Sequence, residues 1–246
     1  MTDAELARAL AQEAGALLRR IRDEKADEGK ALGQRGDREA NALILARLAA
    51  ERPDDAILSE EAKDDRSRCA VRRVWVIDPL DGTREYSERR DDWAVHVGLA
   101  IDSQPVLGAV AIPDRGEVFV SDKVRPPATT RDRPVMVVSR TRAPDVAVSV
   151  AEAIGADLLP MGSAGAKAMA VVDGRADIYL HAGGQYEWDN CAPAAIALGA
   201  GLHASRLDGN PLIYNCEDPL LPDLLICRPS RAAAIIEAVR RYLPIG

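Results

Sequence analysis

Cysteine and histidine are scarce in this chain, which has four cysteines and three histidines among 246 residues. No cysteines show the paired spacing of a metal site or redox motif, so reduced cysteines are expected. No histidines show metal-ligand spacing, and no Ser/His/Asp arrangement is recognisable. Covalent catalysis therefore has little support, and water would be the nucleophile in a hydrolytic reaction. The cysteines are Cys69, Cys191, Cys216 and Cys227.

Long apolar runs and an excess of positive charge are also missing. No stretch approaches the roughly 18 apolar residues of a membrane span, and residues 1–5 lack the basic and apolar regions of a secretory leader. The formal net charge of −7 argues against a general nucleic-acid binder, which would normally carry a basic face. We therefore expect a cytoplasmic protein that binds neither membranes nor nucleic acid, and a small anion would need only a local positive site.

The chain reads as two halves that are joined by a connection. Residues 122–134 combine prolines and charges without an apolar period, which is typical of a surface segment. An N-terminal α+β half is therefore expected at 1–121 and a C-terminal α/β half at 135–246. With 246 residues the chain is long enough to bury a substantial core.

Elements in both halves follow from local patterns. A capping box at Thr2 and Glu5 predicts a helix to about Ile21. Alternating apolar residues in 93–101 and 106–120 predict an antiparallel meander. In the second half, strands alternate with helices, which predicts a mixed sheet covered by helices. The expected helices of that half are 145–154, 164–172, 190–200 and 230–242.

The most informative segment is residues 75–85, Trp-Val-Ile-Asp-Pro-Leu-Asp-Gly-Thr-Arg-Glu. Its apolar start predicts a buried strand that ends at Asp78. Pro79 is expected to turn the chain out of the sheet, so that Asp78 and Asp81 converge on one point. Two carboxylates this close repel each other and need a proton or a cation between them.

Two residues after this acidic pair strengthen the ligand hypothesis. Gly82 allows close approach of the backbone to a ligand, and Thr83 supplies a hydroxyl at the start of the next segment. Oxygen ligands of this kind favour Mg²⁺. Alone, each Asp-Pro or Asp-Gly dipeptide is better explained as a simple turn; the full string together with further carboxylates favours a metal site.

Three further acidic positions lie at the edges of expected elements. Residues 57–61 form a short strand that runs into two carboxylates, and strand alternation sends one of them, which we take to be Glu60, toward Asp78. Asp189 is the expected N-cap of an Ala-rich helix, where the helix dipole favours a carboxylate. Asp37 is expected to open a helix and, taken alone, is better explained as a cap than as a ligand.

The order of these residues resembles the Mg²⁺-dependent, lithium-sensitive inositol monophosphatase superfamily over nearly the whole chain. Within it, the chain is most similar to actinobacterial CysQ-type 3′(2′),5′-bisphosphate nucleotidases, through segments 91–96, 162–169, 181–185 and 204–212. The segment before Asp37, residues 30–36, departs from the family pattern, which bears on a third metal. The resemblance implies an α/β (α+β) protein with the layered αβαβα sugar-phosphatase fold, and a homodimer.

The same resemblance implies roles for the residues in the acidic motifs. Glu60, Asp78, Asp81, Asp189 and the carbonyl of Leu80 would hold two Mg²⁺ ions, with a third left open. Glu60 and Thr83 would orient the attacking water, Asp37 would belong to the catalytic set, and the N–H groups of Gly82 and Thr83 would hold phosphate oxygens.

Three residues are candidates for holding the rest of the substrate. Ser163 is the expected cap of a helix, and Lys167 in its first turns is either a solvated lysine or, with the resemblance, a phosphate ligand. His181, close to Asp189 in the sequence, is a candidate for lining the pocket. His96, in an alternating strand, is more simply a hydrogen-bonded structural histidine. Tyr86, Tyr186 and Trp188 are candidates for packing against a base or ribose, although single aromatics are more often core residues.

The resemblance implies hydrolysis of 3′-phosphoadenosine 5′-phosphate, with its 5′-phosphosulfate relative as a second candidate substrate, in sulfate assimilation. An inositol monophosphatase or fructose 1,6-bisphosphatase would use the same metal-binding residues. A catalytically inactive anion-binding regulatory protein is the alternative of another class, and the intact carboxylates and Thr83 argue against it.

Overall fold

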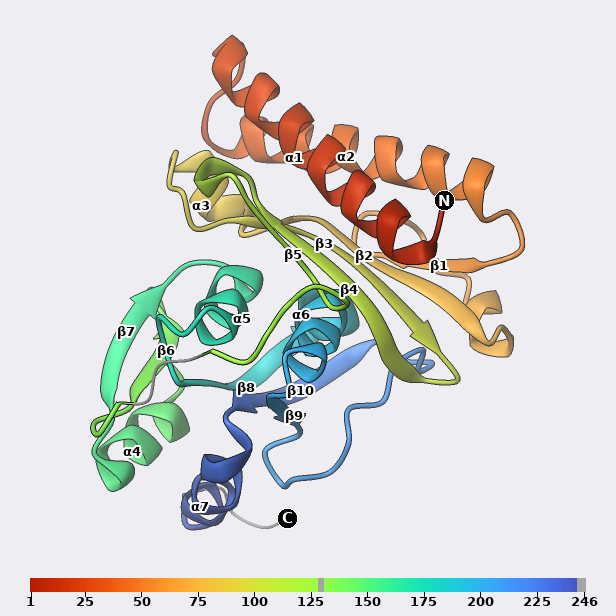
Figure 1. Ribbon diagram of the computed structural model, residues 1–246. Coiled ribbons are helices and arrows are strands. Elements are labelled where there is room, and N and C mark those ends of the chain that lie inside the picture. The colour runs from red at the N-terminus through yellow and green to blue at the C-terminus, as the bar shows by residue number, and fades with distance from the viewer. Residues whose placement is uncertain (128–130, 243–246) are drawn as a thin grey trace.

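Two mixed sheets organise the computed structural model, which describes residues 1–127 and 131–242 (Figure 1). The strands of the first sheet lie side by side in chain order, with β1 parallel to β2 and the other pairs antiparallel. Its strands are β1 (Ala56–Ser59), β2 (Arg73–Asp81), β3 (Ala94–Ile101), β4 (Gln104–Ile112) and β5 (Glu117–Val120). The antiparallel meander that was predicted from alternation is therefore confirmed.

The second sheet has the strand order β7-β6-β8-β10-β9. Strand β6 is parallel to β7 and β8, and β10 is antiparallel to β8 and β9, so this sheet is mixed as predicted. Its strands are β6 (Val135–Ser139), β7 (Asp157–Met161), β8 (Ile178–Tyr186), β9 (His203–Ser205) and β10 (Leu220–Cys227).

Helices form three layers around the sheets. They are α1 (Asp3–Glu24), α2 (Gly29–Glu51), α3 (Thr83–Ser87), α4 (Asp145–Ile154), α5 (Ala164–Val172), α6 (Glu187–Gly199) and α7 (Pro229–Arg240), with short 3₁₀ turns η1 (Ser67–Ala70) and η2 (Pro113–Arg115). Helices α1 and α2 cover the first sheet, α5 and α6 lie between the two sheets, and α4 and α7 cover the second (Figure 1). The layered αβαβα architecture is confirmed.

Strand β2 shows why both faces of the first sheet are buried. Trp75 and Ile77 point into the core under α1 and α2, whereas Val74 and Val76 join the core formed with α5 and α6. Because alternate side chains of a strand face opposite sides, an apolar run without polar positions is what a sheet between two helical layers requires. The middle helical layer packs on both sheets, so the division at residues 122–134, of which 128–130 lie outside the described residues, stays a prediction.

Two predicted helix starts were wrong. Helix α2 begins at Gly29, eight residues before Asp37, so Asp37 lies inside the helix and does not open it. Helix α6 begins at Glu187, so Asp189 is its third residue and not its N-cap. The capping box of α1 is confirmed: the Thr2 hydroxyl accepts from the Glu5 N–H at 3.2 Å, and the Glu5 carboxylate accepts from the Thr2 N–H at 2.9 Å.

Candidate active site

The acidic segment of β2 contains a break in the pairing of strands. Asp78 pairs with His96 of β3, the register then shifts, and Asp81 pairs with Ala94. Pro79 has no N–H to donate, which fits a bulge at this point. The strand was expected to end at Asp78, but it continues through the bulge to Asp81. Both carboxylates are nearly inaccessible, with 1% of Asp78 and 6% of Asp81 exposed.

A short helix follows immediately and fixes the hydroxyl of Thr83. Gly82 has φ +87°, a left-handed conformation that favours glycine, and α3 starts at the next residue. The Thr83 hydroxyl donates to the Leu80 carbonyl at 3.2 Å, and the Leu80 N–H donates to the Asp78 carboxylate at 3.0 Å. Thr83, which was expected at the start of the next segment, is the first residue of α3, and these bonds give the loop one conformation.

Three carboxylates converge at the end of β2. One oxygen from each of Asp78, Asp81 and Asp189 lies within 4.8 Å of the others. The Asp189 carboxylate is oriented by the Tyr186 N–H, which donates to it at 2.6 Å across the first turn of α6. Carboxylates at this spacing provide the hard oxygen ligands that Mg²⁺ prefers, so the residues present fit such an ion.

Glu60 completes what we call the carboxylate cluster, namely Glu60, Asp78, Asp81 and Asp189. Strand β1 lies parallel to β2, and the Glu60 N–H donates to the Ile77 carbonyl at 3.2 Å, which brings Glu60 beside Asp78. Glu60 keeps contact with solvent. Partial removal of its carboxylate from water, followed by the charges of Asp189 and Glu61, raises the pKa of Glu60 to about 7.

The surroundings of the two β2 carboxylates, Asp78 and Asp81, shift their pKa values in opposite directions. Burial, and then the charges of Glu60 and Asp81, raise the pKa of Asp78 well above its usual value. Burial also opposes ionisation of Asp81, but its oxygens accept from the N–H groups of Ala164 at 3.1 Å and Gly165 at 2.6 Å. The charge and hydrogen bond of His96, followed by the hydrogen bond from the Gly165 N–H, lower the pKa of Asp81 below its usual value. Asp78 thus needs a nearby cation to stay ionised.

His96 is the histidine that contacts the cluster. It is fully buried, its Nδ1 lies 3.0 Å from the Trp188 carbonyl, and its Nε2 lies 3.1 Å from the Asp81 carboxylate. The sequence predicted a structural histidine, but it gave no signal for the contact with Asp81, because that contact depends on the register between β2 and β3.

Asp37 lies close to the same centre although it was assigned to the wrong part of its helix. Its Oδ1 is buried without a hydrogen-bond partner among the described residues. Burial, and then the charges of Glu61 and Glu60, raise the pKa of Asp37 to about 7, with the neighbouring Thr83 side chain as the opposing effect. Asp37 is therefore adjacent to Thr83, as its expected place in the catalytic set requires.

Two glycines allow α2 to lie directly on this segment. A Cβ on Gly33 would be 2.6 Å from the Thr83 methyl group and 2.9 Å from the Ser87 hydroxyl. A Cβ on Gly36 would be 2.9 Å from Leu18 and 3.1 Å from Leu80. Residues 30–36, which depart from the family pattern, thus form the first turns of a helix that packs closely on α3.

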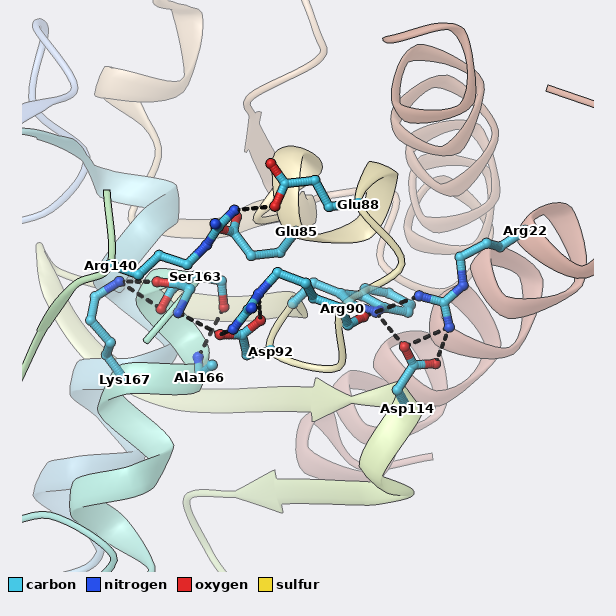
Figure 2. A network of polar contacts seen from close by, with 12 residues as sticks. Arg22, Glu85, Glu88, Arg90, Asp92, Asp114, Arg140, Ser163, Ala166 and Lys167 are labelled. Carbon is cyan, nitrogen blue, oxygen red and sulfur yellow. Dashed lines mark hydrogen bonds and ion pairs between the residues drawn. The ribbon is translucent and has the colours of Figure 1, made fainter. Parts of the chain in front are cut away.

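The start of α5 is held by a polar network (Figure 2). Ser163 caps the helix, since its hydroxyl accepts from the Ala166 N–H at 3.0 Å, as predicted. Asp92 accepts from the Gly162 N–H at 2.7 Å and from both Nε and Nη2 of Arg90 at 2.7 Å. The N–H groups that bind Asp81 follow directly, so this network positions one of the carboxylates.

Lys167 belongs to the interior of this network. It is 5% exposed, and its ammonium group donates to the carbonyls of Gly162 and, at 2.8 Å, Ser163. The nitrogen also lies 5.5 Å from the ring centroid of Tyr179. Burial lowers the pKa of Lys167, and the charge of Asp81 opposes this effect. The ammonium group was expected to face a bound anion, but in the structure protein carbonyls bind it.

A large cavity lies beside α3, at the ends of β6 and β8. Its volume is about 810 Å³, and its wall includes Arg84, Ser139, Arg142, His181, Gly183 and Gly184. His181, a candidate for lining the substrate pocket, lies in the wall of this cavity, and its role in binding substrate stays a prediction. Nearby, the rings of Tyr186 and Trp188 stack with centroids 4.7 Å apart, and 42% of Tyr186 is exposed. Tyr86, in contrast, is fully buried against Trp93.

No helix among the described residues is both long enough and apolar enough to cross a membrane. This finding agrees with the absence of long apolar runs in the sequence.

Comparisons with known proteins agree on one family. The model of the inositol monophosphatase family matches residues 2–243. The 3′-phosphoadenosine 5′-phosphate phosphatase of Mycobacterium leprae is 51% identical over 98% of this chain and 94% of its own length. The protein of the same name from Mycobacterium tuberculosis is 52% identical over 92% of this chain and 89% of its own. The crystal structure of CysQ from Bacteroides thetaiotaomicron superposes with a TM-score of 0.81 at 28% identity, over 92% of this chain and 97% of that one.

Proposed function

Because the chain belongs to the inositol monophosphatase family, whose members depend on metal ions, we propose that it is a Mg²⁺-dependent phosphatase that hydrolyses 3′-phosphoadenosine 5′-phosphate to the 5′-nucleotide and phosphate. The observation that carries the proposal is the convergence of Asp78, Asp81 and Asp189 within 4.8 Å. The names of the mycobacterial relatives supply the substrate. The 5′-phosphosulfate analogue is a second substrate of the same proposal.

The carboxylate cluster, together with the Leu80 carbonyl, would hold two Mg²⁺ ions, and Asp37 near Glu60 and Glu61 is where a third would bind. Bound there, the ions would neutralise charge on the phosphate, lower the pKa of a bound water and stabilise the leaving alkoxide. The number of carboxylates near the centre supports this assignment, since they need cations to stay ionised together.

The remaining roles belong to groups of the protein itself. Glu60, which strand pairing brings beside Asp78, orients the attacking water. The Thr83 hydroxyl donates to the Leu80 carbonyl, so its oxygen is free to accept from that water and orient it. The N–H groups of Gly82 and Thr83, at the start of α3, hold phosphate oxygens. The Ser163 cap and the cavity lined by His181 border the region that receives the nucleoside.

A phosphate-release assay tests the proposal directly. The protein is incubated with 3′-phosphoadenosine 5′-phosphate, inositol 1-phosphate and fructose 1,6-bisphosphate at the same Mg²⁺ concentration, and each reaction is repeated with EDTA. We expect the highest kcat/KM with the nucleotide and no release with EDTA. A preference for either sugar phosphate would support a sister activity, and no Mg²⁺-dependent release from any substrate would support a regulatory anion-binding protein. A cytoplasmic homodimer stays a prediction from the family resemblance.

A further inference from the structure

The cavity beside α3 is built from three segments that are distant in the sequence. Arg84 comes from α3, residues 139–145 connect β6 to α4, and residues 181–184 belong to β8. Arg84 directly follows Gly82 and Thr83, whose N–H groups are the proposed phosphate ligands. Arg84 thus places one wall of the cavity next in the chain to the proposed position of the reacting phosphate.

The basic groups around the cavity differ in whether the protein already neutralises them. Arg140 donates to Glu85 at 2.7 Å and to Glu88 at 2.5 Å. The Lys167 ammonium group is bound by carbonyls. The guanidinium groups of Arg84 and Arg142, in contrast, have no hydrogen bond or ion pair within the part of the chain that the structure describes.

The charge of the cavity wall is therefore positive. Arg84 and Arg142 face a single carboxylate among the lining residues, that of Asp145. His181 adds no charge near neutral pH, because burial, followed by the charges of Lys167 and Arg142, lowers its pKa to about 4. Its buried Nε2 has no hydrogen-bond partner among the described residues. The cavity thus offers two free cations and an unsatisfied neutral imidazole.

We propose that Arg142 and Arg84 bind the phosphate of the substrate that is not cleaved, and so select nucleoside bisphosphates over monophosphates. This inference rests on the proposed function. Guanidinium groups bind phosphate through paired N–H donors, and two unpaired ones at the edge of a cavity of about 810 Å³ suit a dianion attached to a nucleoside. Binding of a substrate phosphate, which the sequence analysis considered for Lys167, is thus assigned to Arg84 and Arg142, whose charges are not already paired within the described residues.

Kinetics with matched substrates test the assignment. In Arg142→Gln and Arg84→Gln, KM for 3′-phosphoadenosine 5′-phosphate should rise roughly tenfold or more, with kcat changed less, because a charge-assisted contact common to ground and transition state is lost. For adenosine 3′-phosphate, which lacks the second phosphate, the rise in KM should be at least fivefold smaller. Arg20→Gln, an exposed arginine of α1, is the control and should match wild type. Equal losses on both substrates would overturn the proposal.

A binding measurement separates this inference from the proposed function. Adenosine 5′-phosphate carries only the phosphate that is not cleaved, so its affinity reports the cavity without hydrolysis. With Mg²⁺ and saturating orthophosphate, wild type should bind adenosine 5′-phosphate more tightly than adenosine, and Arg142→Gln should lose that difference. If wild type does not hydrolyse the bisphosphate but this loss is still seen, the proposed function fails and the subsite stands. If wild type binds the two ligands equally, the subsite assignment is wrong.

Discussion

The carboxylate cluster and the cavity beside it differ in charge and in how their side chains are held. In the cluster, backbone N–H groups fix Asp81 and Asp189, and Asp78 accepts from the Leu80 N–H. In the cavity, Arg84 and Arg142 are exposed and make no side-chain hydrogen bonds within the described residues. One region holds negative charge in fixed positions, and the other offers positive charge on long, adaptable side chains.

This difference indicates that the two regions have different roles, the carboxylate cluster in the chemical step and the cavity in binding a distant part of the substrate. Groups that stabilise charge in a transition state are most effective when they are already oriented, whereas groups that bind a distant part of the substrate need only reach it. Changes in the cluster or in the elements that hold it should therefore lower kcat. Changes in the cavity should raise KM. The predictions below test this division.

The largest effect is expected for Asp78→Asn. The substitution keeps the shape of the side chain but removes a charge for a metal ion, so kcat should fall by roughly a thousandfold or more. Because Asp78 is buried among other carboxylates, the metal-free variant should unfold at a temperature equal to or above that of metal-free wild type. The rise in Tm on adding Mg²⁺ should be lost.

Thermal unfolding with and without Mg²⁺, combined with the phosphate-release assay, checks this prediction. Asp132→Asn, at an exposed carboxylate in the connection between the halves, is the control and should keep both activity and the Mg²⁺-dependent rise in Tm. Near-normal activity of Asp78→Asn at saturating Mg²⁺ would show that Asp78 is not a metal ligand.

A smaller effect on kcat is expected for Gly33→Ala, which acts on an element that supports the cluster. The added methyl group would lie 2.6 Å from the Thr83 methyl group, so Thr83 must move. Misplacement of a catalytic group by about 1 Å can cost up to a hundredfold, and we expect kcat to fall by tenfold to a hundredfold with KM within about twofold of wild type.

The stability of the Gly33→Ala variant should change little, because alanine gains about 1 kcal/mol of helix propensity, which offsets the overlap. Gln34→Ala, on the exposed face of α2, is the matched control. A variant with normal kcat would mean that the packing of α2 does not set the position of Thr83.

Much of the cluster could be predicted from the sequence because its signals are local. An apolar run that meets Asp78 and Pro79, a glycine before Thr83, and a serine that caps α5 each act through neighbours in the chain. The start of α2 was missed for a physical reason. Glycines at 29, 33 and 36 disfavour a helix locally, but Gly33 and Gly36 allow close packing of α2 against distant residues.

No local pattern in the sequence predicted the residues that line the cavity. Arg84, Arg142 and His181 meet only because β6, β8 and α3 come together, and nothing around Arg142 in the sequence distinguishes it from the paired Arg140. The environment of Lys167 was missed for a different reason. The carbonyls of Gly162 and Ser163 that bind it are close in sequence, but a lysine near a helix start gives no sign of whether its side chain turns back onto the chain or extends to a ligand. Local patterns identify groups that act through the backbone, and they fail for long side chains whose partners are set by packing.

A third prediction concerns Lys167, whose ammonium group is bound by carbonyls at the start of α5. In Lys167→Met the chain length is kept, but two carbonyls lose a charged donor and Asp81 loses a nearby cation. We expect the free energy of unfolding to fall by about 1 to 3 kcal/mol. The value of kcat/KM should fall severalfold, by the same factor for 3′-phosphoadenosine 5′-phosphate and adenosine 3′-phosphate, because a positioning residue serves both substrates.

The ratio of the two kcat/KM values is the deciding measurement, with Arg142→Gln assayed in parallel. If Lys167→Met raised KM for the bisphosphate alone, as much as Arg142→Gln does, Lys167 would reach the second phosphate after all. The carbonyl contacts seen in the structure would then belong only to the protein without substrate.

The smallest effect concerns a carboxylate outside both regions, which serves as the reference for the cluster. Asp55 accepts from Arg73 at 2.8 Å and from the Trp75 indole at 2.9 Å. Burial opposes its ionisation, but these donors lower the pKa of Asp55 below its usual value, the opposite of Asp78. A lowered pKa in the folded state means that ionised Asp55 stabilises the fold above its unfolded pKa of about 3.9, and that this contribution is lost as the pH falls through the folded value.

Asp55→Asn should therefore lower the free energy of unfolding by about 1 kcal/mol at pH 7, and by progressively less below about pH 4. Urea unfolding at several pH values, with the exposed Asp54→Asn as control, measures this difference; a deficit that stayed constant down to pH 3 would mean that packing, and not the charge of Asp55, stabilises this contact.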